Sequence, residues 1–192
     1  MAELWLIRHG ETVWSVSGAH TGTTDIPLTP AGEAQAAGIR TTLADRKFSL
    51  VLSSPLRRAR KTCELAGFGN VMQIEPRLTE WNYGSYEGLT TPEIRKKIPG
   101  WSPFKDGFPG GELLEQVASR ARAVIDRAVA SDRAVATDGD VALFAHGHIL
   151  RILTACWLGL PADAARLFAL NPAGVSTLGY ERETRVIQHW NR

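Results

Sequence analysis

The sequence is poor in net charge and in cysteine. Its 192 residues carry a formal net charge of +2, which is too small and too scattered to favour nucleic acid as a partner. The two cysteines, Cys63 and Cys156, lack the spacing of a metal site and lie in apolar helical contexts. We therefore expect buried free thiols in a reducing cytoplasm.

Long hydrophobic segments are also lacking. Residues 141–160 are rich in apolar side chains, but two histidines and an arginine interrupt them and would be costly in lipid. The first residues show no basic stretch followed by an apolar core, because Arg8 and His9 end the only early hydrophobic run. We therefore expect neither a membrane-spanning segment nor a signal peptide.

The composition that remains is typical of a globular domain. Apolar residues make up 44% of the chain and charged residues 22%, which argues against disorder. We find no repeat, low-complexity tract or linker, so residues 1–192 are expected to form one domain. Short apolar strands alternate with helices, a pattern that predicts a three-layer α/β/α sandwich around a mostly parallel sheet.

The apolar periodicity predicts the order of the elements. Strands are expected at residues 4–7, 49–53, 71–75 and 141–145, with a closing hairpin at 175–180 and 186–190. Helices are expected at residues 30–45, 54–67, 112–130 and 149–157. Residues 11–27, 78–89 and 131–140 are expected to be irregular, and 99–111 to form a loop or lid. Leu113 and Leu114 are assigned to the core face of the helix at 112–130.

The strand at residues 4–7 ends abruptly on Arg8, His9 and Gly10. Its bulk indicates a buried strand, and in an open α/β sheet ligands bind at the carboxyl ends of the strands. A histidine there, with a cation beside it and a glycine that lets the backbone come close, suits attack on a phosphoryl group. Taken alone, however, a histidine at a strand end is more often structural than catalytic.

Two further strand ends carry polar residues. Ser54 precedes Arg57 and Arg58, and the strand at 141–145 ends on His146-Gly147-His148. We expect all three strand ends to meet at the same edge of the sheet. A phosphoryl group in transfer needs several fixed donors around its equatorial oxygens, and arginines, a histidine and a helix N-terminus supply them.

Four segments, in order along nearly the whole chain, form a recognisable series. They are RHGET at residues 8–12, SPLRRARKT at 54–62, LTE at 78–80 with YG at 83–84 and EG at 87–88, and AHGH at 145–148. This series resembles the histidine phosphatase superfamily, in its phosphoglycerate mutase-like branch. The fold expected above is the one that this resemblance implies.

The resemblance implies that His9 is a nucleophile that carries the phosphoryl group transiently, and that Arg8, Arg58 and His146 complete the phosphate pocket. It also implies that Glu80 protonates the leaving oxygen and then activates water, with no metal and no cofactor. Because an alkoxide leaves poorly, this acid must hold its proton near working pH, and we expect an activity optimum on the acidic side. The arginines should lower the pKa of His9, and a backbone acceptor in the glycine loop should fix its tautomer.

Within the superfamily the sequence favours a phosphatase over a mutase. Leu89 follows Gly88 where the mutases carry a lysine, and the later arginine pair that grips glycerate in the mutases is missing. Ser15 stands where the mutases have a phosphate-holding asparagine. The segments at 14–22 and 81–88 look more like acid phosphatases and sugar bisphosphatases. We therefore predict hydrolysis of small phosphomonoesters, namely sugar phosphates, sugar bisphosphates or phosphoglycerates, with phosphoglycerate mutase as the alternative.

Eight residues are candidates for contact with the substrate: Ser15, Thr21, Gly22, Ser54, Tyr83, Gly147, His148 and Arg151. The resemblance to sugar bisphosphatases makes Arg151 a grip on a second phosphate, although an arginine on a helix surface fits the pattern equally well.

Two other classes of function stay open. His146 and His148 could form a metal pair, but the five histidines of the chain suggest no complete ligand set. A pocket that only binds a phosphorylated metabolite or a protein would not need both a nucleophile and an acid. We expect a phosphorylated small molecule as the partner, without nucleic acid or membrane, and the sequence leaves monomer and homodimer both open.

Overall fold

A six-stranded sheet forms the middle layer of the computed structural model, which describes residues 2–134 and 139–192. Its strands are β1 (Leu4–Arg8), β2 (Phe48–Ser53), β3 (Met72–Ile74), β4 (Asp140–Ala145), β5 (Val175–Glu181) and β6 (Thr184–His189). They lie in the order β3-β2-β4-β1-β5-β6. The first four are parallel, β5 pairs antiparallel with β1, and β6 pairs antiparallel with β5. The prediction of a mostly parallel sheet is confirmed.

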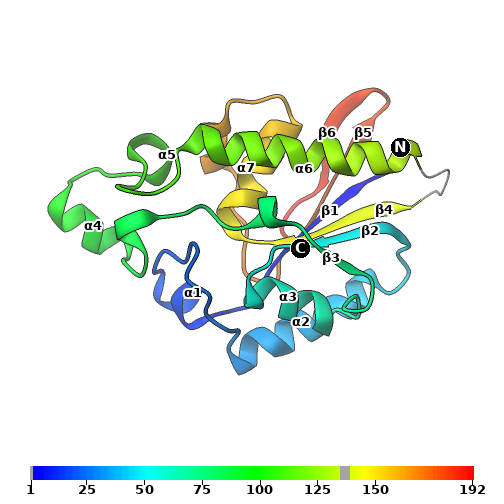
Figure 1. Ribbon diagram of the computed structural model, residues 1–192, viewed down its shortest axis with the longest axis horizontal. Coiled ribbons are helices and arrows are strands. Elements are labelled where there is room, and N and C mark those ends of the chain that lie inside the picture. The colour runs from blue at the N-terminus through cyan, green and yellow to red at the C-terminus, as the bar shows by residue number, and fades with distance from the viewer. Residues whose placement is uncertain (1, 135–138) are drawn as a thin grey trace.

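Helices cover both faces of this sheet (Figure 1). They are α1 (Val13–Ser17), α2 (Pro30–Leu43), α3 (Arg57–Leu65), α4 (Thr91–Lys97), α5 (Pro103–Asp106), α6 (Leu114–Ala134) and α7 (Gly147–Trp157). Three short 3-10 helices are η1 (Pro76–Leu78), η2 (Gly84–Tyr86) and η3 (Ala162–Leu167). Helices α2 and α3 pack on one face and α6 and α7 on the other, while α1, α4 and α5 lie beyond the strand ends at the left of Figure 1.

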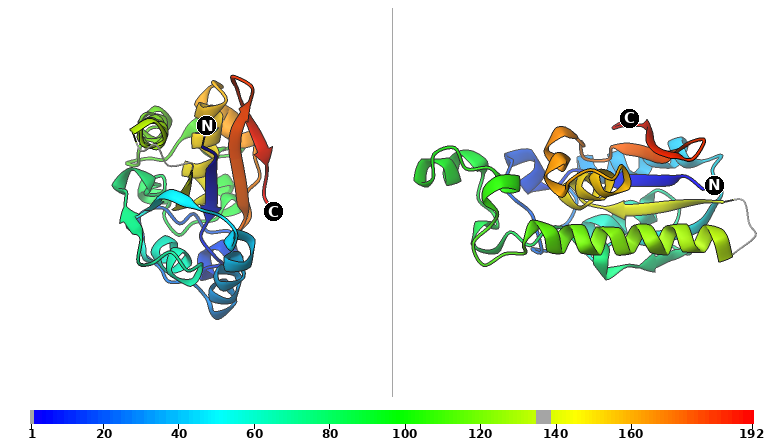
Figure 2. Two further views of the ribbon diagram at one scale, coloured as in Figure 1. Left: turned by 90° about the vertical axis from the view of Figure 1, so that its right-hand side faces the viewer. Right: turned by 90° about the horizontal axis from the view of Figure 1, so that it is seen from above.

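The two cores arise because side chains alternate between the faces of a strand. Leu4 and Leu6 of β1 pack on the side of α6 and α7, whereas Trp5 and Ile7 pack on the side of α2 and α3. Strands β2 and β4 divide their apolar residues in the same way. Figure 2 shows a helical layer on either side of the sheet, so the predicted three-layer sandwich is confirmed.

The starts of α3 and α7 differ from the expectation, and α6 begins at Leu114 rather than at residue 112. Helix α3 begins at Arg57 with Leu56 as its N-cap, so Ser54 does not cap it and is free for another role. Helix α7 begins at Gly147, two residues before the predicted start. The first difference leaves Ser54 in the loop after β2, and the second puts His148 in the first turn of α7. Both lie beside the strand ends, where sequence periodicity carries little information.

All four segments that were expected to be irregular or loop contain helix, including η2 in 78–89 and α5 in 99–111. The loop at 11–27 includes α1, which Thr12 and Ser15 cap reciprocally. Helix α6 continues to Ala134, past the connection predicted from residue 131, and residues 135–138 lie outside the described residues. Leu113 precedes α6 and is 69% exposed, so its assignment to the core is wrong.

Both cysteines are free thiols. Cys63 is buried and Cys156 is half-buried, so the prediction of a buried thiol holds only for the first. Burial raises the pKa of Cys63 to about 12, which makes it a packing residue rather than a nucleophile. No helix in the described part of the chain is long and apolar enough to cross a bilayer.

The pairing of β1 with β4 fixes the edge at which the site forms. Arg8 lies opposite Ala145 in the parallel register, so the next residues, His9 and His146, leave the sheet side by side. Strand β3 reaches the same edge and leads through Glu75 and η1 to Glu80. The carboxyl ends of these parallel strands therefore converge as predicted.

We expect Glu75 to stabilise this arrangement in a pH-dependent way. Its side chain is 2% exposed and pairs with Arg77 and Arg127 at 2.7 and 2.6 Å. The hydrogen bonds from Arg77, ahead of those from Arg127, lower the pKa of Glu75 to about 2. A pKa below the unfolded value gives stability that is complete above about pH 5 and is lost as pH falls through the folded value.

Glu75→Gln should therefore lower the free energy of unfolding by about 1–2 kcal/mol at pH 7, and by much less near pH 2.5. Urea unfolding at both pH values checks this. Glu115→Gln, which removes an exposed carboxylate paired with Arg122, is the control and should change stability little. A Glu75→Gln deficit that stays the same at both pH values would contradict the assignment.

Candidate active site

His9 leaves β1 with its backbone held on both sides. Its N–H donates to the Ala145 carbonyl at 3.0 Å, and its carbonyl accepts from the Ala173 N–H at 3.0 Å. The neighbouring Gly10 must be glycine, because a Cβ there would lie 2.3 Å from the Gly32 carbonyl oxygen. The close approach of α2 therefore sets the backbone turn on which the histidine stands.

The tautomer of His9 follows from its hydrogen bond. Its Nδ1 lies 2.7 Å from the Gly10 carbonyl oxygen, which can only accept, so Nδ1 carries the proton. Nε2 then keeps its lone pair and has no partner among the described residues. Burial, and after it the charges of Arg58 and Arg8, lower the pKa of His9 well below its ordinary value. The neutral, nucleophilic form therefore persists at mildly acidic pH.

His146 lies beside His9 with its ring fixed at both nitrogens. The two ring centroids are 5.2 Å apart. Arg58 Nε donates to His146 Nδ1 at 3.1 Å, so Nε2 carries the proton and donates to Ser54 Oγ at 2.7 Å. Burial and Arg58 lower the pKa of His146 well below its ordinary value. This imidazole is a neutral donor, and Ser54 orients it.

Arg58 is completely buried and is held by carbonyl oxygens of the loop at residues 21–24. Nη1 donates to the Thr24 carbonyl at 2.9 Å, and Nη2 donates to those of Gly22 at 2.8 Å and Thr21 at 3.3 Å. With Nε on His146, four of the five guanidinium N–H groups are committed, which leaves one on Nη1. The charge of Arg58 is thus fixed in place behind the two histidines.

Glu80 approaches from the opposite side, on the N-terminus of α7. Its Oε2 accepts from the His148 N–H at 2.9 Å, and its Oε1 accepts from the N–H groups of Ile149 and Trp81 at 2.9 Å each. Two of the N–H groups that α7 cannot pair internally are therefore capped by a residue distant in sequence. Glu80 as a whole is only 4% exposed, and both of its oxygens act as acceptors in this arrangement.

The segment before Glu80 is anchored by an arginine of α6. Arg120 donates to the carbonyls of Arg77, at 2.7 Å, and Thr79. Glu112 holds the other side of the guanidinium at 2.8 and 3.0 Å. This ion pair gives the backbone at Thr79 one position, and thereby the carboxyl group of Glu80.

These groups surround a cavity of about 210 Å³. Its walls include His9, Arg8, Glu80 and six of the eight candidate substrate contacts, namely Ser15, Thr21, Tyr83, Gly147, His148 and Arg151. Arg8 Nε is buried and has no hydrogen-bond partner among the described residues, while its Nη1 donates to the Leu170 carbonyl. An unpaired guanidinium N–H beside the N-terminus of α7 is a site for an anion.

Four predicted residues lie behind the cavity wall rather than on it: Gly22, Ser54, Arg58 and His146. Gly22 and Ser54 bind Arg58 and His146, so in this geometry they support the pocket and do not form its surface. Ser15 lines the cavity, but its hydroxyl already donates to the Thr12 carbonyl at 2.9 Å in the cap of α1.

The outer wall of the cavity is aromatic. The Tyr83 hydroxyl and His148 Nδ1 are hydrogen-bonded, and His20 packs against the Tyr83 ring with centroids 5.2 Å apart. Burial raises the pKa of Tyr83 well above its ordinary value and lowers that of His148 well below it, so both are neutral. Trp101 and Phe108, from the segment expected to form a loop or lid, are buried behind this wall. They contribute packing to it.

Arg151 supplies the second cation of the cavity. Its Nε donates to the Ala165 carbonyl at 3.1 Å, and its Cζ lies 5.2 Å from the centre of the Phe104 ring. This side chain is held against η3 and an aromatic ring and faces the cavity. The surface-arginine interpretation therefore does not describe its surroundings.

The metal interpretation of His146 and His148 finds no ligand set. The ring nitrogens of His146 contact Arg58 and Ser54, and His148 Nδ1 contacts Tyr83. Within residues 2–134 and 139–192, no group of three histidine, cysteine, aspartate or glutamate side chains is arranged to hold a metal ion.

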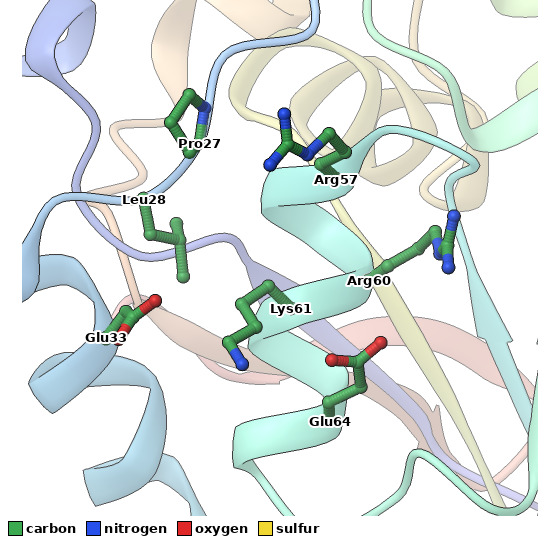
Figure 3. Close-up of a pocket in the computed structure, with 7 residues that line it drawn as sticks. All are labelled: Pro27, Leu28, Glu33, Arg57, Arg60, Lys61 and Glu64. Carbon is green, nitrogen blue, oxygen red and sulfur yellow. The ribbon is translucent and has the colours of Figure 1, made fainter.

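A second cavity lies in the groove between α2 and α3 (Figure 3). Its volume, about 450 Å³, exceeds that of the cavity at His9. Exposed side chains of both charges line it, among them Arg57, Arg60, Lys61 and Glu33. It holds no histidine and no buried polar side chain, so we assign the chemistry to the smaller cavity.

Sequence analysis missed two residues that hold the site together, Arg120 and Glu87. Arg120 is one of several arginines on α6, and nothing in the helical periodicity marks its contact with Thr79. Glu87 was noted only as part of a motif, yet it accepts hydrogen bonds from three consecutive backbone N–H groups, at residues 22–24. The separation of 63 to 65 residues between the partners hides this contact from the sequence.

The site at this sheet edge is typical of α/β enzymes that act on phosphate esters. It combines a histidine with a free Nε2, two arginines, a helix N-terminus and a carboxyl group. The family model of the histidine phosphatase superfamily (branch 1) matches residues 4–192. The chain belongs to this superfamily and is a phosphatase of small phosphorylated metabolites.

Three known proteins illustrate the relationship. An acid phosphatase of Mycobacterium tuberculosis is 40% identical over 184 residues, which cover 95% of this chain and 88% of the relative. A sedoheptulose 1,7-bisphosphatase of Saccharomyces cerevisiae is 37% identical over 183 residues, which cover 81% of this chain and 67% of the relative. The solved structure of an open reading frame product of Mycobacterium tuberculosis superposes with a TM-score of 0.92 at 37% identity, covering 99% of this chain and 97% of that one.

We expect Arg120→Met to lower kcat by about tenfold, because Thr79 loses its anchor and Glu80 its fixed position. Steady-state kinetics with p-nitrophenyl phosphate, with circular dichroism to verify the fold, measures this. Arg122→Met is the matched control on the same helix, since Arg122 pairs with the exposed Glu115. Equal activity of the two variants would show that Arg120 does not position Glu80.

Proposed function

We propose that the chain hydrolyses phosphomonoesters of small metabolites through a phosphohistidine on His9, with Glu80 as the general acid and base. The observation that carries this proposal is the free Nε2 of a neutral, buried His9 in one cavity with Arg8 and Glu80. The nucleophile needs no deprotonation, because its tautomer already presents the lone pair.

In the first step, His9 Nε2 forms a bond to phosphorus while the bond from phosphorus to the ester oxygen breaks. Arg8 and the Gly147 N–H at the start of α7 line the cavity and receive charge on the phosphoryl oxygens, and the charge of Arg58 behind the two histidines adds to the positive potential there. Glu80 gives its proton to the departing alkoxide, which leaves as an alcohol.

In the second step, water attacks the phosphorus atom and the bond to His9 Nε2 breaks. Glu80, now a carboxylate, takes the proton of the attacking water, and phosphate leaves. The lowered pKa of His9 keeps the released imidazole neutral, so the next cycle starts without a proton transfer. The expected activity optimum on the acidic side stays a prediction, and this property of His9 is compatible with it.

Arg151 supports the finer proposal of a bisphosphorylated substrate. It lies on α7 one turn beyond the N-terminus that faces Glu80, and it shares the cavity with Arg8. Two cations in one cavity match an ester with a second anionic group, such as a sugar bisphosphate. The named relatives include a sugar bisphosphatase. A cytoplasmic location and a single domain stay predictions of the sequence, and the choice between monomer and homodimer stays open.

The trapping experiment tests the central step. Brief exposure of the wild type to a labelled phosphomonoester, followed by alkaline quench, should leave acid-labile label on His9, because a bond from phosphorus to nitrogen resists base and not acid. His9→Ala should carry no label and should lose phosphate release by at least about a thousandfold. Hydrolysis by the wild type without acid-labile label would overturn the proposal.

His189→Ala serves as the control for that experiment, since His189 is exposed on β6 and remote from the cavity. It should label and hydrolyse like the wild type. A parallel assay with phosphoglycerate separates the mutase alternative: isomerisation faster than phosphate release would replace hydrolysis as the function.

Arg151→Met should lower kcat/KM for a sugar bisphosphate by about tenfold or more and leave that for p-nitrophenyl phosphate nearly unchanged. The reason is that only the bisphosphate has a second anionic group for Arg151 to bind. Phosphate release from the two substrates under the same conditions gives the ratio. An equal loss for both would assign Arg151 to the general structure of the pocket.

A further inference from the structure

Glu87 lies outside the cavity, directly after η2. Its carboxylate accepts five hydrogen bonds from the described residues. Oε2 accepts from the Gly22 N–H at 3.2 Å, the Thr24 N–H at 3.3 Å and the Thr24 hydroxyl at 2.7 Å. Oε1 accepts from the Thr23 N–H at 2.9 Å and the Tyr83 N–H at 3.4 Å. Three consecutive amide groups thus converge on one carboxylate, as they do on an anion in a backbone nest.

The opposite side of the same peptide groups binds Arg58. In a trans peptide the N–H and C=O groups point in opposite directions. The peptide between Thr21 and Gly22 donates to Glu87 and accepts from Arg58, and so does the peptide between Gly22 and Thr23. A carboxylate, two aligned peptide dipoles and a guanidinium therefore stand in series.

The arrangement requires glycine at position 22. A Cβ at that position would lie 2.0 Å from Glu87 Oε1 and 2.4 Å from the Trp81 carbonyl oxygen. Only glycine lets the loop approach the carboxylate so closely. The loop therefore has little freedom to turn its carbonyl oxygens away from Arg58 while Glu87 is in place.

Arg58 transmits this constraint to the histidines. Its Nε donates to His146 Nδ1, and its charge is the second cause, after burial, of the low pKa of His9. If the loop carbonyls turned, Arg58 would lose three acceptors while remaining buried, a costly state that favours its movement.

We propose that Glu87 is a positioning residue of the phosphate site, which fixes the loop at residues 21–24 so that its carbonyl oxygens hold Arg58 against His146. The inference rests on the proposed function, since it assigns Arg58 to phosphate binding. Glu87 itself touches no substrate. Its role is to give the buried guanidinium a single orientation.

Glu87→Gln tests the proposal, because one side-chain oxygen becomes an NH2 group that faces backbone donors. We expect the dissociation constant for vanadate to rise by about tenfold, and kcat/KM for p-nitrophenyl phosphate and a sugar bisphosphate to fall by the same factor. An equal loss follows because the phosphoryl group, and not the leaving group, is affected. Glu93→Gln is the control: Glu93 also accepts from a threonine N–H and hydroxyl, at 2.8 and 2.7 Å, but in the exposed cap of α4.

Two readouts separate positioning from a loss of stability. The pKa of His9, measured by NMR, should rise in Glu87→Gln as the charge of Arg58 moves away. In a double-mutant cycle, Glu87→Gln should add little to the effect of Arg58→Met on vanadate binding. An unchanged pKa of His9 with additive effects would overturn the proposal, even if the variant melts at a lower temperature.

Thr24→Val provides a second route if Glu87→Gln does not fold. It removes one donor to Glu87 and should weaken vanadate binding in the same direction by a smaller factor, whereas no change would count against the proposal. Vanadate binding and the pKa of His9 need no turnover. If the wild type neither releases phosphate nor forms phosphohistidine, the proposed function fails, while these two measurements still decide the role of Glu87.

Discussion

The buried charge of Arg58 is the constraint on which the rest of the site depends. A guanidinium without water must find acceptors for its N–H groups, and here the protein provides three carbonyl oxygens and one imidazole nitrogen. That requirement brings the loop at residues 21–24, α3 and the strand end at His146 to one point. Burial, and after it this fixed positive charge, lowers the pKa of both His146 and His9 and keeps them neutral.

The sheet and the arginine cooperate in placing the nucleophile. Parallel pairing of β1 with β4 brings His9 and His146 out side by side, and Gly10 allows α2 to approach. These are backbone effects, and they join segments far apart in the sequence. The electrostatic environment comes from side chains, above all the guanidinium of Arg58. A site of this kind requires both, because a free Nε2 is useful only where protonation is suppressed.

Much of this could be predicted from the sequence, for physical reasons that differ between elements. The apolar runs at β1 and β4 are continuous because both faces of these strands are buried, and they end on polar residues, so the site edge was visible. The acceptor for His9 Nδ1 was predictable, since Gly10 is adjacent. In contrast, α1 and the start of α3 depend on caps and loop contacts. Leu113 fits the apolar pattern and is nevertheless exposed, because α6 begins after it.

The capped start of α7 links two negative charges. The carboxylate of Glu80 already occupies two N–H groups of this helix end, and an arriving phosphate must settle within the same turn. Like charges at such a separation repel, so the cations of Arg8 and Arg151 in the same cavity must outweigh this carboxylate before an anionic ester can enter.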